Sequence, residues 1–140
     1  MSASPLELLQ DEVVEAALRR AYQESDVGGT NPREQGGFIV RDGDGALRVD
    51  RLPAGEEDAL EFPVCRDGVY NGEKIAGTFH THPNIGTGWR QEPSQADIEF
   101  SVNFPETSGP HQFVVSKANI YHIANDGVVS TVGATTDLIF

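Results

Sequence analysis

Residues 77–83 read Gly77-Thr78-Phe79-His80-Thr81-His82-Pro83, and this stretch decides how the rest of the chain is interpreted. The segment from Lys74 to Phe79 predicts a buried strand, and Pro83 is a natural end for it. Side chains at positions i and i+2 of a strand project from the same face. His80 and His82 are therefore predicted to point the same way, so that two imidazoles can share one metal ion.

Asp97 supplies the third candidate ligand. It closes the stretch Ser94-Gln95-Ala96-Asp97, which follows a proline and is typical of a helix N-terminus. In one interpretation the two side chains only cap the helix and complement its dipole. In the other they also face one cleft, because residues three apart share a helix face. We favour both roles together, since His80, His82 and Asp97 then give the three protein ligands of a catalytic zinc site.

The remaining pattern predicts further helices and strands around this stretch. We expect a first helix over Pro5–Tyr22, begun by a Ser-Pro-x-Glu cap. Its predicted core-facing stripe comprises Leu6, Leu9, Val13, Ala16, Ala17 and Ala21. A second helix is expected to start at Ser94 and to end near Phe104. Strands are expected over 38–40, 46–52, 60–65, 112–116, 119–124 and 128–132.

Four residues outside the central stretch are candidates for chemistry. Glu34 stands at the entrance of an apolar strand, where a carboxylate is costly unless it is paired or useful. His111 and His122 are candidate fourth ligands, although structural or surface histidines are the commoner case. Cys65 is the only cysteine, so an internal disulfide and a Cys-x-x-Cys zinc site are excluded, and we expect it in the core.

Charge and length narrow the classes of function. The chain has 140 residues, which predicts one domain over 1–140, and its formal net charge is −12. Nucleic acid and anionic membranes are poor partners for such a chain, because a phosphate-neutralising stripe is absent. No run is long and apolar enough to span a bilayer, and no signal-peptide core is evident. With one cysteine, these features predict a cytoplasmic protein.

Taken together, three fragments resemble the JAMM motif of the JAB/MPN metallopeptidases. They are Glu34-x-x-Gly37, His80-Thr81-His82-Pro83 and Ser94-x-x-Asp97, in the order the family has them. The resemblance covers the chain from about residue 32 to at least residue 104. Within the family, the chain is similar to a compact prokaryotic-type member. The loop over 83–93 is longer than is usual in the family, so Trp89 or Arg90 is a candidate substrate contact, with Trp89 alternatively covering the core edge.

The resemblance implies an α/β fold, with a mixed β-sheet flanked by helices in a JAB/MPN-like, cytidine-deaminase-like architecture. It also implies one Zn²⁺ held by His80, His82 and Asp97, with Glu34 as general base and Ser94 as oxyanion donor. The implied activity is hydrolysis of peptide or isopeptide bonds in a protein or peptide substrate, with ubiquitin-like or sulfur-carrier tails as one class. Two alternatives stay open: a non-catalytic MPN-type scaffold, and a peptidase module of a secreted toxin system.

Overall fold

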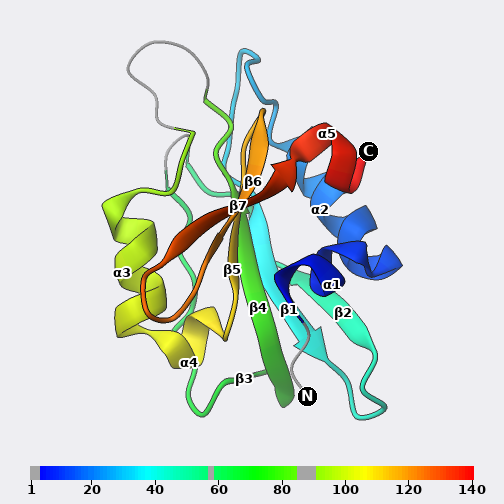
Figure 1. The fold of residues 1–140 in the computed structure, drawn as a ribbon, viewed down its shortest axis with the longest axis vertical. Helices are drawn as coiled ribbons and strands as arrows, with labels where there is room; N and C mark the ends of the chain where they lie inside the picture. The colour runs from blue at the N-terminus through cyan, green and yellow to red at the C-terminus, as the bar shows by residue number, and fades with distance from the viewer. Residues whose placement is uncertain (1–3, 57–58, 85–90) are drawn as a thin grey trace.

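The fold is built on one mixed sheet, seen in a computed structural model that describes residues 4–56, 59–84 and 91–140 (Figure 1). The strands are β1 (Gly36–Arg41), β2 (Leu47–Arg51), β3 (Val69–Tyr70), β4 (Glu73–Thr81), β5 (Gln112–Val115), β6 (Asn119–Ile123) and β7 (Val129–Ala134). The helices are α1 (Pro5–Gln10), α2 (Glu12–Glu24), α3 (Gln95–Asn103), α4 (Pro105–Ser108) and α5 (Thr135–Ile139). The predicted α/β class with a mixed sheet flanked by helices is confirmed.

The sheet has the strand order β2-β1-β4-β5-β6-β7, with β3 paired to β4 off this path. The β4–β5 pair is parallel and its neighbours are antiparallel, which makes the sheet mixed. A parallel pair needs a crossover, and here α3 and α4 supply it. The strand β4, which contains His80 and ends just before His82, lies in the interior of the sheet between β1 and β5.

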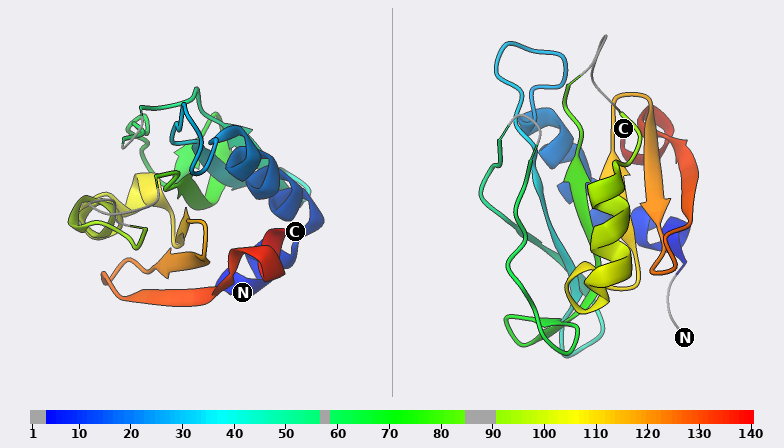
Figure 2. Two further views of the ribbon diagram at one scale, coloured as in Figure 1. Left: turned by 90° about the horizontal axis from the view of Figure 1, so that it is seen from above. Right: turned by 90° about the vertical axis from the view of Figure 1, so that its left-hand side faces the viewer.

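Helices cover both faces of this sheet (Figures 1 and 2). Helices α1, α2 and α5 lie on one side and α3 and α4 on the other. The larger core cluster lies under the first group and includes Leu9, Leu18, Phe79 and Phe113, all buried. A smaller cluster on the other face is centred on Phe38 and includes Cys65, as predicted for that cysteine.

The N-terminal helix differs from the prediction. It is two helices, because Asp11 ends α1 and its side chain accepts hydrogen bonds from the N–H groups of Val13 and Val14 at 2.9 and 3.2 Å. This break changes the phase of the buried stripe. Leu9 and Ala21 are buried as predicted, but Leu6 is 43 % and Val13 50 % exposed, and Ala16 is exposed too. The residues of α1 and α2 that face the core are Leu8, Leu9, Val14, Leu18 and Ala21.

A second prediction was wrong at residues 60–65. No strand forms there, and among the described residues the ladder contact next to it is an isolated bridge between Arg66 and Val69. Pro63 has no N–H to give to a ladder, which explains the loss of pairing. The strand β3 and the short helices α4 and α5 were not predicted. Trp89 and Arg90 lie outside the described residues, so the prediction about them stays a prediction.

No helix of the described residues is long and apolar enough to cross a membrane.

Candidate metal centre

The two histidines lie where the central strand ends. His80 is the second-last residue of β4, opposite Gly36 of β1 on one side and Val114 of β5 on the other. His82 follows the strand, but its N–H still donates to the Val115 carbonyl at 2.9 Å, so the extended path continues. Both imidazoles consequently project from one face, and their Nε2 atoms are 3.3 Å apart.

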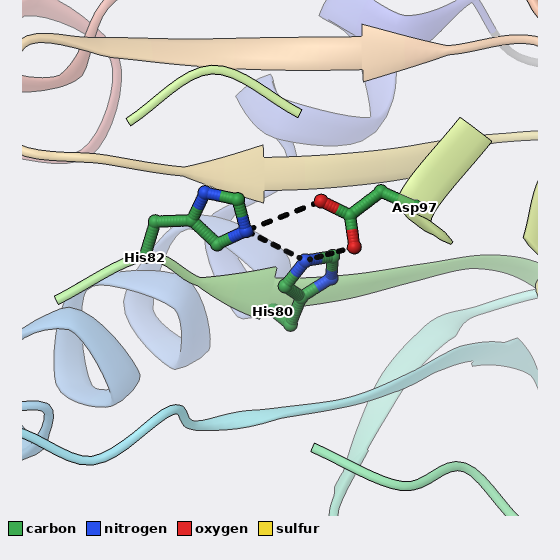
Figure 3. A group of neighbouring side chains, drawn as sticks. All are labelled: His80, His82 and Asp97. Atoms are coloured by element: carbon green, nitrogen blue, oxygen red, sulfur yellow. Dashed lines mark hydrogen bonds and ion pairs between the residues drawn. The ribbon is translucent and has the colours of Figure 1, made fainter. Parts of the chain in front are cut away.

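Asp97 reaches the same point from the first turn of α3. Ser94 and Asp97 form a reciprocal capping box: the Asp97 N–H donates to Ser94 Oγ at 3.1 Å, and the Ser94 N–H donates to Asp97 Oδ2 at 2.8 Å. The same carboxylate places Oδ1 3.2 Å from His80 Nε2 and Oδ2 3.2 Å from His82 Nε2 (Figure 3). Capping and a site-facing carboxylate therefore occur together.

The spacing of these atoms fits a tetrahedral zinc ion. Zinc binds imidazole nitrogen and carboxylate oxygen at about 2.0–2.2 Å, so two ligand atoms of a regular tetrahedron lie about 3.3–3.6 Å apart. The two Nε2 atoms are 3.3 Å apart, and each lies 3.2 Å from a different oxygen of Asp97. One ligand atom from each of the three residues lies within 4.8 Å of the other two. The site can hold one divalent ion with little rearrangement.

One hydrogen bond sets the tautomer of a ligand. The His82 Nδ1 lies 3.2 Å from the carbonyl oxygen of Gln91. A carbonyl oxygen only accepts, so Nδ1 carries a proton and donates it to Gln91. A metal in the site would take the place of the proton that Nε2 shares with the Asp97 carboxylate. Such a partner on the outer nitrogen is the usual arrangement for a metal-binding histidine.

Charges in the site favour a cation. Burial opposes a charge on His80, but the Asp97 carboxylate, its hydrogen bond and the charge of Glu34 outweigh burial and raise the pKa of the His80 imidazole. Burial also acts to raise the pKa of Asp97. The charge of His80 and the hydrogen bonds from His80, His82 and the Ser94 N–H outweigh it and hold that pKa well below its usual range. Asp97 is therefore ionised, as a metal ligand must be.

Glu34 lies beside the ligands and is clamped through its backbone. Its N–H donates to the Glu56 carbonyl at 2.8 Å, and its carbonyl accepts the N–H of Gly55 at 2.8 Å. The side chain is buried and lines the same cleft as His80 and His82. Its charge raises the pKa of His80. A carboxylate that was unremarkable in sequence is thus brought to the site by backbone hydrogen bonds to residues 55 and 56.

The structure adds a residue that sequence reasoning missed. Gln112, buried at the start of β5, donates through Nε2 to the Asp97 carbonyl at 2.8 Å and to Ser101 Oγ at 2.6 Å. These bonds tie the first turns of α3 to the sheet and hold Asp97 against the histidines. No short-range signal links Gln112 to Asp97, because the contact arises only when β5 pairs with β4.

The two remaining histidines do not join the site. His111 Nδ1 and His122 Nε2 are 2.8 Å apart and form a pair of their own, packed against Phe113. Among the residues that the structure describes, the metal-capable group comprises only His80, His82 and Asp97. The structural interpretation of His111 and His122 thus agrees with their positions.

Comparison with known proteins adds little to this geometry. No protein-family model matches the chain, and no curated protein matches it. A solution structure of a protein from Salinibacter ruber is similar over 96 % of this chain and 90 % of that one, with 20 % identity and a TM-score of 0.36.

Proposed function

We propose that this chain is a zinc-dependent hydrolase of peptide or isopeptide bonds, with a JAB/MPN-like fold and site. The observation that carries the proposal is the convergence of one carboxylate and two imidazole nitrogens, which offer one ligand atom each within 4.8 Å of one another. A buried glutamate stands in the same cleft and is not needed as a ligand. Three ligands and a further carboxylate in the same cleft are what water activation requires.

A zinc ion bound here would supply a water whose pKa falls from ~15.7 toward ~7, and would polarise the scissile carbonyl. Glu34 accepts the proton of the attacking water and delivers it to the leaving amine, acting as general base and then as general acid. Two hydrogen bonds fix the backbone of Glu34, from which this side chain enters the cleft.

Ser94 has the second role. Its Oγ accepts the Asp97 N–H, so the hydroxyl hydrogen can be donated to another acceptor in the cleft that Ser94 lines. We assign this donor to the developing oxyanion of the tetrahedral intermediate. Losing one such donor typically lowers the rate by about 10²–10³.

The test separates metal binding from turnover. Purified protein is loaded with zinc, its metal content is measured, and it is screened against peptides and ubiquitin-like conjugates. Glu34→Gln should keep zinc and lose hydrolysis, whereas His80→Ala should lose both. Glu12→Gln, an exposed carboxylate on α2, serves as the matched control and should retain both. Hydrolysis by Glu34→Gln at the wild-type rate, or a wild type that binds no zinc, contradicts the proposal.

A further inference from the structure

The cleft that contains the metal ligands is larger than the ligands need. Its volume is about 950 Å³, and it runs between the segment 59–64 and helices α3 and α4. Its lining includes the polar side chains of Glu34, His80, His82 and Asp97. It also includes Phe62, Val64, Phe100 and Phe104, which we call the apolar subsite. A concave site with mostly apolar walls and a few convergent polar groups is the usual form of a ligand pocket.

Aromatic contacts hold the wall of the apolar subsite in place. The rings of Phe62 and Phe100 stack with centroids 5.2 Å apart, which joins the irregular segment 59–64 to α3. On its other side Phe62 packs edge-on against Phe38, 5.4 Å away, and Phe38 is fully buried. The wall is therefore anchored to the core and is formed before any ligand arrives, which lowers the ordering cost of binding.

The outer part of the apolar subsite is open to solvent. Val64 is 81 % exposed and Phe104 52 % exposed, yet both line the cleft. A single exposed apolar side chain needs no explanation, but a set of them inside a concave site next to polar groups marks a binding surface. A segment of two glycines would leave this surface in water, because glycine has no side chain to bury there.

The charges that line the cleft restrict which polypeptide segments can bind in it. Among the described residues that line the cleft, the carboxylates are Glu34, Glu61 and Asp97, and no lysine or arginine is present. An acidic side chain placed there would meet carboxylates of like charge and no lysine or arginine of the described lining to pair with, which is unfavourable. A neutral or basic stretch of polypeptide is compatible with the same walls.

We propose that the apolar subsite binds a large apolar side chain of the substrate polypeptide, close to the scissile bond, and that acidic residues are excluded from that position. The inference rests on the proposed hydrolase function and names its substrate class. The occupant is an extended, uncharged or basic segment carrying leucine, phenylalanine or a similar residue. Tails of small residues alone are poorer substrates.

The experiment measures binding and cleavage separately. A set of capped peptides is made that is identical except at one position X, which is Leu, Phe, Gly or Glu and is moved to each side of the central bond. Affinities for the zinc-loaded Glu34→Gln protein are measured by NMR titration, and cleavage by the wild type is followed by mass spectrometry. At the best placement we expect Leu or Phe to bind at least about tenfold more tightly than Gly, since a buried leucine-sized side chain contributes that much. Glu should bind no better than Gly.

Variants of the apolar subsite connect the preference to its walls. Val64→Ser and Phe104→Ala change exposed positions, so both should fold, and each should reduce the Leu-over-Gly ratio several-fold. Val13→Ser on α2 is the control, because Val13 is an exposed valine that does not line the cleft. This variant should leave the Leu-over-Gly ratio unchanged.

The outcomes separate the two proposals. Selective binding without any zinc-dependent cleavage supports the apolar subsite and counts against the hydrolase. Cleavage that depends on zinc and Glu34, with equal affinity for the Leu and Gly peptides, keeps the hydrolase and overturns the apolar subsite. A preference that survives both Val64→Ser and Phe104→Ala also overturns it.

Discussion

Replacing Thr81 by valine tests how the strand between the two histidines is held. Thr81 is fully buried, and its Oγ1 lies 2.5 Å from Ser25 Oγ. Ser25 donates its single hydroxyl hydrogen to the Ala21 carbonyl at 2.9 Å, so Thr81 must be the donor to Ser25. Thr81 Oγ1 in turn accepts the N–H of Gln35 at 3.0 Å, the residue next to Glu34. One hydroxyl thus joins the C-terminal end of α2, the strand β4 and the residue that follows Glu34.

The size of the effect follows from these bonds. Thr81→Val keeps the shape but deletes two hydrogen bonds and leaves the buried Gln35 N–H without this acceptor. An orphaned buried donor costs about 1–3 kcal/mol and a lost hydrogen bond about 1 kcal/mol, so the free energy of unfolding should fall by about 2–4 kcal/mol. For a chain of this length the melting temperature should drop by roughly 6–15 °C.

Urea denaturation of the zinc-free protein, with a chelator present, measures this loss without the stabilising effect of bound metal. Thr81→Ser keeps the hydroxyl and should lose only about 1 kcal/mol for the missing methyl group. Thr131→Val, at an exposed position of β7, should stay within about 0.5 kcal/mol of wild type. The reasoning is refuted if Thr81→Val is as stable as wild type, or if Thr81→Ser is as damaging as Thr81→Val.

Two further predictions concern stability. Gly36→Ala should lower the free energy of unfolding by more than about 2 kcal/mol, because a Cβ there would collide with the Phe79 carbonyl oxygen across the β1–β4 ladder. Gly43 faces open space, so Gly43→Ala should change stability little. The urea midpoints of the two variants measure the difference. Burial and the neighbouring charge of His111 lower the pKa of His122 from 6.5 to about 4. Its neutral form therefore contributes stability that is complete above pH 6.5 and is lost as the pH falls through about 4, by about 1–3 kcal/mol. His122→Phe should lose less stability than wild type between pH 7 and pH 4, and parallel curves would contradict the assignment.

Much of the candidate site was predicted from rules that concern short stretches of sequence. The alternation of side chains in a strand put His80 and His82 on one face, and the Ser94-x-x-Asp97 pattern marked a helix start that the structure has. Both rules concern residues within a few positions of each other. The prediction of one helix over Pro5–Tyr22 required the same helical periodicity to continue through Asp11. Asp11 caps a second helix instead, so the predicted helix is divided there.

Residue type and spacing by themselves determined which side chains can serve as ligands and which way each one points relative to its own strand or helix. Whether those ligands meet was decided by tertiary structure alone: the parallel pairing of β4 with β5 and the anchor from Gln112 bring α3 to the histidines. The same holds for Glu34, clamped by residues 55 and 56, and for the stack of Phe62 on Phe100. Backbone stereochemistry sets direction over a few residues, whereas distances between segments depend on how the whole core packs.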